Sequence, residues 1–189
     1  MTAELVAAPT LDERRPRRAD AARNFDALVA AGREAFGEDG AGASLEDIAR
    51  RAGVGIGTLY RNFPTRDDLI ETIYLSEVEA LILAANDVAD LEPWSALRAW
   101  LDRFVEYVGT KHALLAGLNG ESRVFADCKA SLLGAGSSLV KNAQASGDVK
   151  PELSVSDVVK LVSAVSAVRA DDEQQRRRLI DLAIDSLRA

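Results

Sequence analysis

The pattern of apolar and polar positions is most informative in residues 44–63, where it predicts two short helices joined by a tight turn. The apolar positions recur at the three- and four-residue spacing of a helix face and comprise Leu45, Ile48, Ala49, Ala52, Val54, Leu59 and Phe63. Gly53 interrupts them, as suits a left-handed turn position that a Cβ would disfavour. The second helix, of about two turns, is too short to be stable alone. It must be held by its neighbours, as in a helix-turn-helix, whose second helix enters a DNA major groove.

The rest of the chain also predicts helices, and no segment shows the alternation of a β-strand. The expected helices cover about residues 19–36, 44–52, 56–63, 66–88, 94–108, 112–118, 121–145, 155–168 and 171–187, with a loop at 37–43. Capping boxes are expected at Ser44/Asp47, Thr65/Asp68 and Ser154/Asp157. The prediction is therefore an all-α fold of about nine helices. It has a flexible arginine-rich arm at 1–18, a three-helix helix-turn-helix domain at 19–65 and a larger helical domain at 66–189.

The 189 residues suffice for one large domain or two small ones. Apolar runs are short, as at residues 81–85, and the N-terminus carries RRPRR in place of the apolar centre of a signal peptide, so we expect a cytoplasmic protein. His112 and Cys128 are lone, without metal-ligand spacing to a partner, and structural roles are expected for both. No catalytic triad, carboxylate pair or phosphate-binding loop is visible. We therefore expect no enzyme, no cofactor and no metal site.

The net charge of −7 argues mildly against DNA binding, but its distribution matters more. Residues 1–63 hold nine basic and ten acidic side chains, a net charge of −1, and residues 64–189 hold the other fourteen basic and twenty acidic ones, a net charge of −6. Residues 14–23 contain five arginines and one acid, and residues 53–63 contain Arg61 and no acid. The surface expected to meet phosphate is thus locally positive on an acidic body, which should weaken non-specific DNA binding.

From residue 24 to residue 72 the chain resembles the DNA-binding domain of the tetracycline-repressor (TetR) family. The resemblance rests on an apolar helix ending in Phe36 before a glycine-containing loop, then on SLEDIARRAGV and GTLYRNFPTRDDL. A weaker resemblance is the stretch A-x-x-x-G-D-V-K-P-E-L-S-V-S-D, which is similar to the connector before the last two helices of that family; residues 93–145 match only in helix number and length. The resemblance implies a homodimer that binds a palindromic double-stranded operator and usually represses transcription. It also implies a small-molecule effector, so that residues 66–189 would form a ligand-binding and dimerisation domain.

The expected DNA contacts lie in the arm, the turn region and the helix at 56–63. They are Arg14, Arg15, Arg17, Arg18, Ser44, Gly55, Ile56, Gly57, Thr58, Tyr60, Arg61, Asn62 and Arg66. By resemblance, the hydroxyls of Thr58 and Tyr60 contact phosphate, which fixes register without reading sequence. Arg66 resembles a phosphate-contacting position, with a solvated charge as the alternative. Ser44 fits a helix cap better than a contact, and the Tyr60 ring can pack on the domain while its hydroxyl reaches DNA.

The positions that would read bases are poor in hydrogen-bond donors. Ile56 can touch a thymine methyl group but cannot donate to guanine, and the glycines on either side allow close approach of the backbone. Arg61 is the helix's one long basic side chain. We therefore expect the arm arginines to enter an adjacent minor groove, although a disordered solubilising tail is the alternative.

Five of the ten aromatic residues lie between Trp94 and Phe125, and three of them recur on one helix face. The residues expected to line an apolar ligand cavity are Trp100, Phe104, Tyr107, Phe125 and Leu133. Ordinary core is an equally good interpretation of each aromatic side chain. Gly134 and Gly136, inside a predicted helix, would leave room for a ligand or let another helix approach closely.

The last two helices are rich in aliphatic and small residues, which suits a four-helix bundle made by two subunits. The residues expected at this dimer interface are Val155, Val158, Val162, Val165, Leu179, Leu182, Ala183 and Ser186. The alternative is that both helices close the core of a single protomer.

The leading hypothesis is a DNA-binding transcriptional regulator, a repressor released from its operator by a small, largely apolar or aromatic effector. A second hypothesis is a dimeric DNA-binding protein without an effector, whose C-terminal domain serves only dimerisation or a protein partner. An all-α enzyme fits poorly, because no catalytic constellation is visible.

Overall fold

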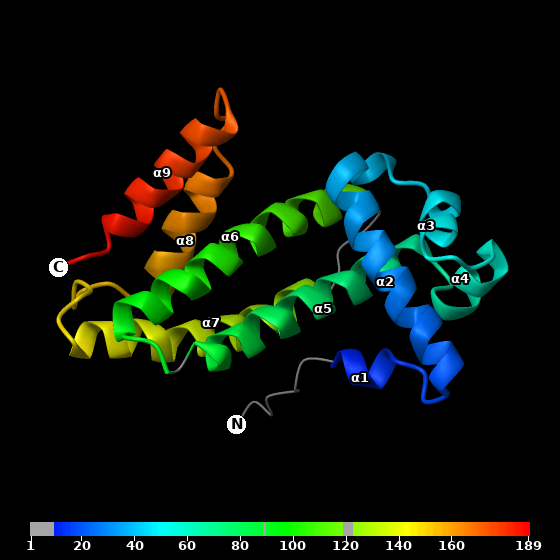
Figure 1. Cartoon of the computed structure of the whole chain (residues 1–189), viewed down its shortest axis with the longest axis horizontal. Coiled ribbons are helices and arrows are strands. Elements are labelled where there is room, and N and C mark those ends of the chain that lie inside the picture. The colour runs from blue at the N-terminus through cyan, green and yellow to red at the C-terminus, as the bar shows by residue number, and fades with distance from the viewer. Residues whose placement is uncertain (1–9, 89, 119–122) are drawn as a thin grey trace. The chain divides into compact units, whose positions relative to one another are not determined.

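The computed structural model describes residues 10–88, 90–118 and 123–189, and this part of the chain contains helices and no β-strand (Figure 1). Its elements are α1 (Leu11–Arg14), α2 (Ala19–Asp39), the 3-10 helix η1 (Gly40–Gly42), α3 (Leu45–Arg51), α4 (Ile56–Asn62), α5 (Arg66–Asp87), α6 (Pro93–Gly117), α7 (Arg123–Ala145), α8 (Val155–Ser166) and α9 (Glu173–Asp185). The predicted all-α fold is confirmed.

Besides the loop expected at 37–43, where α2 continues to Asp39 and η1 follows, two elements differ from those predicted. Residues 94–108 and 112–118 were expected to form separate helices, but both belong to α6, which continues through Gly109. A glycine inside a helix costs only about 1 kcal/mol relative to alanine, and the burial of Val108 and Leu114 on either side offsets this cost. The second difference is α1, which lies within the arm expected to be flexible. The described helices number nine, as expected, because this addition offsets the merged pair.

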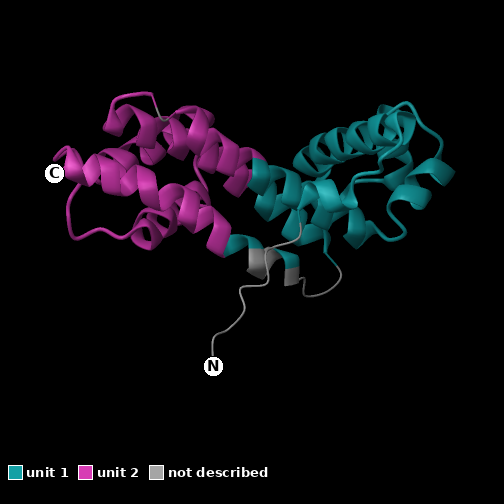
Figure 2. Ribbon diagram, turned by 90° about the horizontal axis from the view of Figure 1, so that it is seen from below, with its two compact units in different colours: residues 1–79, 110–129 teal, residues 80–109, 130–189 magenta. Residues whose placement is uncertain are grey.

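The helices divide into two compact units, which Figure 2 distinguishes by colour. Unit 1 comprises Met1–Glu79 and Thr110–Lys129, and unit 2 comprises Ala80–Gly109 and Ala130–Ala189. Helices α5, α6 and α7 therefore each contribute residues to both units. The division does not follow the predicted boundary between residues 65 and 66, because the first half of α5 supplies core residues to unit 1.

The core of unit 1 is built from α2, α3, α4 and α5. Its buried apolar side chains include Phe25, Leu28, Ala35, Phe36, Ile48, Leu59, Phe63, Leu69, Ile70 and Ile73. The rings of Phe25 and Phe63 lie 5.1 Å apart between centroids. Aromatic pairs at this separation stabilise a core beyond the area that they bury. This core holds α4, a helix of seven residues that would not persist alone.

The turn between α3 and α4 has the geometry that the sequence predicts. Gly53 adopts a φ of +70°, in the left-handed region. The N–H of Gly53 donates to the Arg50 carbonyl at 3.1 Å, and the N–H of Val54 donates to the Ala49 carbonyl at 3.0 Å. These two bonds are those of a Schellman motif, which satisfies carbonyls at the end of a helix. The motif ends α3 and sets the direction in which α4 begins.

Two of the three predicted capping boxes are present. Thr65 and Asp68 exchange reciprocal hydrogen bonds before α5, and Ser154 and Asp157 do so before α8. The third is incomplete, because the Ser44 hydroxyl accepts from the Asp47 N–H at 3.4 Å, but the Ser44 N–H does not donate to the Asp47 carboxylate in return. That carboxylate instead accepts from the guanidinium groups of α3, which lower its pKa.

In unit 2, α8 and α9 lie side by side (Figure 1). The connector that precedes α8 is fixed by Gln144, whose side-chain amide lies within hydrogen-bonding distance of the carbonyls of Lys150, Pro151 and Leu153 at 3.0, 3.3 and 2.8 Å. Lys150 in turn donates from its ammonium group to the Ser186 carbonyl at 2.8 Å, which ties the connector to the end of α9. The start of α8 and the end of α9 are thus anchored to the same connector.

We predict that Gly53→Ala lowers the free energy of unfolding by about 1–2 kcal/mol, because alanine is disfavoured at this positive φ. Gly57→Ala is the matched control: Gly57 lies inside α4, has no positive φ, and a Cβ there would meet nothing within 4 Å. We expect this control to be as stable as the parent, or more stable. Thermal denaturation of both variants checks the prediction, and equal stability of the two would contradict it.

Candidate nucleic-acid interface and ligand pocket

Helix α4 presents the predicted reading face to solvent. Ile56 is 37% exposed and Tyr60 is 48% exposed, and Arg61 is exposed beside them. On the opposite face Leu59 and Phe63 are buried in unit 1. The structure therefore places Ile56, Tyr60 and Arg61 on the outer side of a helix whose inner side is fixed.

Two polar residues of this helix are less available than expected. Thr58 and Asn62 are half-buried, and the Asn62 side-chain amide donates to the Thr58 carbonyl at 2.8 Å. This bond lies within α4 and stabilises its last turn. The predicted DNA contact of Asn62 would have to use its remaining amide atoms.

The glycines at the start of α4 are not required by the fold. Gly55 and Gly57 both lack a positive φ, and a Cβ built on either one would meet nothing within 4 Å. At the helical position of Gly57, glycine is less favourable than alanine by about 0.8–1.0 kcal/mol, whereas Gly55 is the N-cap of α4, where glycine is preferred over alanine. Their effect is to leave the backbone at this end of α4 uncovered, as close approach to another molecule would require.

Arg66 has a structural role that its sequence position did not indicate. Its guanidinium donates to the carbonyls of Ala43 and Ala41 at 2.6 and 2.8 Å, and it lies 4.8 Å from the centroid of the Phe36 ring. Its guanidinium is therefore engaged within the protein and is not a simple solvated charge, while its predicted phosphate contact would have to use the remaining N–H groups. Arg66 joins the first turn of α5 to the segment that leads into α3.

The arm arginines divide into two pairs. Arg14 donates to the Thr72 hydroxyl at 3.1 Å and to the Glu71 carboxylate at 3.0 Å. Arg15 donates from two nitrogens to the Asp26 carboxylate, and this bidentate contact lowers the pKa of Asp26. These residues are therefore not a free arm.

Arg17 and Arg18 differ from Arg14 and Arg15, and the backbone of α1 makes a further contact with α5. Arg17 and Arg18 are exposed, and the N–H of Leu11 donates to Glu79 at 2.6 Å. The segment from α1 to Arg15 is held to acidic groups of α2 and α5. Sequence reasoning could not find this contact, because its acidic partners lie 11 to 68 residues further along the chain.

The predicted aromatic stripe on α6 is packed. Trp100, Phe104 and Tyr107 are all buried, and successive ring centroids lie 5.7 Å apart. The indole N–H of Trp100 donates to the Leu81 carbonyl at 3.1 Å. A Cβ at Gly136 would lie 2.5 Å from the Trp100 ring, so this glycine accommodates the indole and leaves no room beside it. These contacts favour the core interpretation.

The other two residues predicted to line the ligand cavity, Leu133 and Phe125, give no further evidence for such a cavity. Leu133 is half-buried on α7. The side chain of Phe125 lies outside the described residues. Neither of the two pockets described next has Trp100, Phe104 or Tyr107 in its wall.

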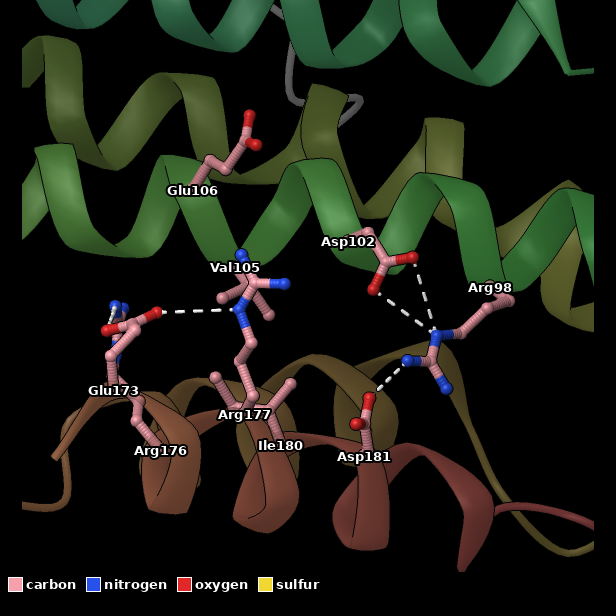
Figure 3. Close-up of a pocket in the computed structure, with 9 residues that line it drawn as sticks. All are labelled: Arg98, Asp102, Val105, Glu106, Glu173, Arg176, Arg177, Ile180 and Asp181. Atoms are coloured by element: carbon pink, nitrogen blue, oxygen red, sulfur yellow. Dashed lines mark hydrogen bonds and ion pairs between the residues drawn. The ribbon is translucent and has the colours of Figure 1, made fainter. Parts of the chain in front are cut away.

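A pocket of about 670 Å³ lies between α6 and α9 in unit 2 (Figure 3). We call it the α6–α9 pocket, and it is lined by Arg98, Asp102, Val105, Glu106, Glu173, Arg176, Arg177, Ile180 and Asp181. Its volume falls in the range of small-molecule sites, but its wall is mostly charged. A second pocket, of about 480 Å³, lies in unit 1 between α1, α2, α5 and the part of α6 at Thr110.

The predicted dimer residues do not all lie on an exposed face. Val158, Val162 and Ala183 are buried within the protomer, at 0%, 1% and 8% exposure, so they cannot form the dimer contact that was expected of them. Val155, Val165 and Leu179 are half-buried, and Ser186 is exposed. The stripe that we assigned to a partner thus packs partly against the protomer's own core.

The exposed apolar residues of these helices lie elsewhere. Leu161 and Val168 are 38% and 52% exposed, and Leu182 of α9 is 67% exposed. Leu161 and Val165 are four residues apart on α8, which places them on one helical face, and Val168 follows shortly after the end of that helix. The sequence shows both this set of apolar residues and the set that contains Val158 and Val162. Only their burial in the structure tells which set faces the protomer's own core.

No helix among the described residues is long and apolar enough to cross a membrane. Within the same residues, no group of three or more His, Cys, Asp or Glu side chains could hold a metal ion.

Two family descriptions match the chain. Residues 28–73 match "Bacterial regulatory proteins, tetR family", and residues 92–189 match "Transcriptional regulator SbtR-like, C-terminal domain". The second match alone covers slightly more than half of the 189 residues.

Individual proteins are similar as well. The HTH-type transcriptional regulator SAR0097 of Staphylococcus aureus (strain MRSA252) is 29% identical over 108 residues, which are 56% of this chain and 56% of that protein, so the match spans about half of the curated relative. The crystal structure of the TetR transcriptional regulator SCO0520 from Streptomyces coelicolor is 38% identical, with a TM-score of 0.73, over 87% of this chain and 98% of that one. The TetR transcription regulatory protein from Mycobacterium vanbaalenii is 28% identical, with a TM-score of 0.73, over 92% and 100% of the chains.

We predict that Gly136→Ala lowers the free energy of unfolding by about 1–3 kcal/mol, because the added methyl group would overlap the Trp100 ring. Gly134→Ala, on the same helix, meets nothing within 4 Å and should leave stability unchanged or raise it by up to about 1 kcal/mol. Chemical denaturation of the two variants distinguishes a packed ring from a movable one. Equal stability would indicate that Trp100 can move aside into an open cavity, contrary to this account.

Proposed function

The chain belongs to the tetR family of bacterial regulatory proteins, and from this we propose that it acts in the cytoplasm as a homodimeric repressor that binds a two-fold symmetric operator and is released by a small-molecule effector. The observation that carries the DNA-binding part is the exposed face of α4 on a helix-turn-helix fixed by Gly53. A helix held in this way can enter a major groove without ordering itself on contact.

We infer that some residues of α4 contact DNA phosphates and that others contact the bases. Tyr60, Arg61 and Thr58 would contact phosphates and set the register, and they would carry little sequence information. Ile56 would contact a thymine methyl group in the major groove, and the bare backbone at Gly55 and Gly57 would allow close approach. This face offers few donors to guanine, so shape and phosphate position must contribute much of the specificity.

We infer that arginines of the arm contact DNA by exchanging their carboxylate partners for DNA phosphates. Arg14 donates one hydrogen bond to Glu71 and Arg15 donates two to Asp26, and phosphate groups also accept such bonds from a guanidinium. Arg17 and Arg18, which are exposed, would be available first. The negative field of DNA would then compete with the two carboxylates for the other pair.

For the dimer, we propose a revised interface, which we call the α8–α9 outer face. It consists of Leu161, Val165, Val168, Leu179, Leu182 and Ser186. Exposed and half-buried side chains, mostly apolar, on two adjacent helices and directly after their ends suit a two-fold four-helix bundle. Such a dimer would hold two α4 helices about one turn of DNA apart, ~34 Å.

The course of α5 supports a coupling between effector binding and DNA binding. This helix continues without a break from unit 1 into unit 2, and its first residue, Arg66, holds the segment before α3 through two carbonyls. A shift of the first turn of α5 would therefore act on the helix-turn-helix directly. The effector would shift a population between two states, which requires that it bind one of them more tightly.

Titration of the purified protein against duplex DNA from its own upstream region tests the proposed function. We expect saturable binding that survives an excess of unrelated competitor duplex, because specific sites are typically bound at least about 10³-fold more tightly. Fluorescence anisotropy measures this directly. Binding that the competitor abolishes at stoichiometric levels would overturn the assignment of a sequence-specific regulator.

The contribution of the arm predicts a change in salt dependence. Replacing Arg14 and Arg15 by glutamine should weaken operator binding and reduce the slope of log K against log salt by about 2, since each phosphate contact contributes about 0.9. Replacing Arg103 and Arg169, which are exposed in unit 2, by glutamine is the control with the same change in charge. An identical slope in all three proteins would contradict a role of these arginines in DNA contact.

The revised interface predicts that one charged residue introduced into it prevents dimerisation. Leu182→Glu should convert the dimer into a monomer, because a carboxylate at the centre of an apolar interface lacks a partner. Leu83→Glu, at a residue of α5 that is 61% exposed, is the matched control and should remain dimeric. Sedimentation velocity separates the two states, and a dimeric Leu182→Glu protein would show that the contact lies elsewhere.

A further inference from the structure

The exposed side of α9 carries an arginine, a leucine and an aspartate in a row. Arg178, Leu182 and Asp185 are four and three residues apart, a spacing that places them on one side of a helix. Leu182 is 67% exposed, the Asp185 side chain is 62% exposed, and Arg178 is exposed as well. Leu182 belongs to the α8–α9 outer face, so this face has a cation one turn before its most exposed leucine and an anion one turn after it.

Arg178 has no carboxylate partner within the part of the chain that the structure describes. The other two arginines of α9, Arg176 and Arg177, lie 3.5 and 3.7 Å from Glu173 and line the α6–α9 pocket on another side of the helix. Arginine is the cation that suits an interface ion pair, because its planar fork can donate two parallel hydrogen bonds to one carboxylate. Arg178 is therefore available to a carboxylate from a second molecule.

Asp185 is held within the protomer by one long contact. It lies 3.6 Å from the guanidinium of Arg98, and the same guanidinium also pairs with Asp102 and Asp181. One arginine thus serves three carboxylates, and Asp185 has no cation of its own. A carboxylate has two oxygens and can accept hydrogen bonds from a second guanidinium without losing the first contact.

A two-fold axis perpendicular to α9 beside Leu182 brings these two charges together. Residues 178 and 185 are about 10 Å apart along the helix, and Leu182 lies close to the midpoint. In an antiparallel pair of α9 helices, Arg178 then lies opposite Asp185 of the partner subunit, and the symmetry repeats this pair on the other side of the axis. A parallel pair would instead place each charge opposite its own copy, which is repulsive.

We propose that the α9 helices of two copies pack antiparallel across Leu182, and that Arg178 forms an ion pair with Asp185 of the partner subunit on each side of the axis. The inference rests on the proposed dimer and adds the register of its helices and the residues that select a second copy of this chain. Charged pairs beside an apolar centre contribute mainly to the choice and orientation of the partner. A chain that lacked either charge would leave its counterpart unpaired.

Charge reversal tests this pairing. Arg178→Asp and Asp185→Arg each turn both ion pairs into like-charge contacts, so we expect either variant alone to self-associate at least about 100-fold more weakly than the parent. An equimolar mixture of the two variants regains both attractive pairs. We therefore expect a one-to-one heterodimer, with a dissociation constant within about tenfold of that of the parent dimer. Sedimentation velocity measures the association, and native mass spectrometry distinguishes the heterodimer by its mass.

Two exposed residues of unit 2 away from this face provide the matched controls. Arg103→Asp on α6 and Asp87→Arg on α5 make the same changes in charge, and each should dimerise as the parent does, alone or mixed. Circular dichroism verifies the folding of every variant. If the second cation beside Arg98 unfolds Asp185→Arg, Asp185→Asn replaces it and should associate with Arg178→Asp more tightly than either variant associates with itself.

The pairing is overturned if a folded charge-reversal variant dimerises as tightly as the parent, or if the mixture of two folded variants forms no heterodimer. A monomeric parent would overturn the proposed dimer together with this pairing. A dimeric parent with variants that behave like the controls would overturn the pairing alone and leave the proposed dimer standing.

Discussion

The exposed face of α4, which would contact DNA, depends on the packing that holds this short helix in place. A helix of seven residues lacks the length to be stable in water, and here it persists because Leu59 and Phe63 are buried in the core of unit 1 and Gly53 closes the turn before it. The anchored side leaves Ile56, Tyr60 and Arg61 outward. Loss of either support would leave the reading face without a fixed direction.

Arginine side chains make the contacts that join these elements to one another, to backbone carbonyls in one case and to carboxylates in the others. Arg66 ties the start of α5 to the segment before α3, and Arg14 and Arg15 hold α1 against acidic groups of α2 and α5. In unit 2, Arg98 gathers three carboxylates from α6 and α9. A net charge of −7 therefore conceals local arrangements in which the cations are already engaged, and DNA or a ligand must compete for them.

The sequence predicted what depends on local spacing and missed what depends on distant partners. Helical periodicity, the turn at Gly53 and two capping boxes were predictable, because each arises within a few residues. The role of Arg66 and the docking of α1 were not, because their partners lie far along the chain. Periodicity identified an apolar stripe through Val158 and Val162, but it could not distinguish a stripe that faces the protomer's own core from one that faces a partner.

The reading face is poor in hydrogen-bond donors, and a dimer would present two such faces about one turn of DNA apart. The most direct test is selection of binding sites by the purified protein from a pool of random duplexes, followed by sequencing. The account predicts enrichment of a two-fold symmetric site, with half-sites about 10 base pairs apart and thymine favoured where Ile56 would meet the major groove. Recovery of no enriched sequence, or of a single asymmetric half-site, would contradict it.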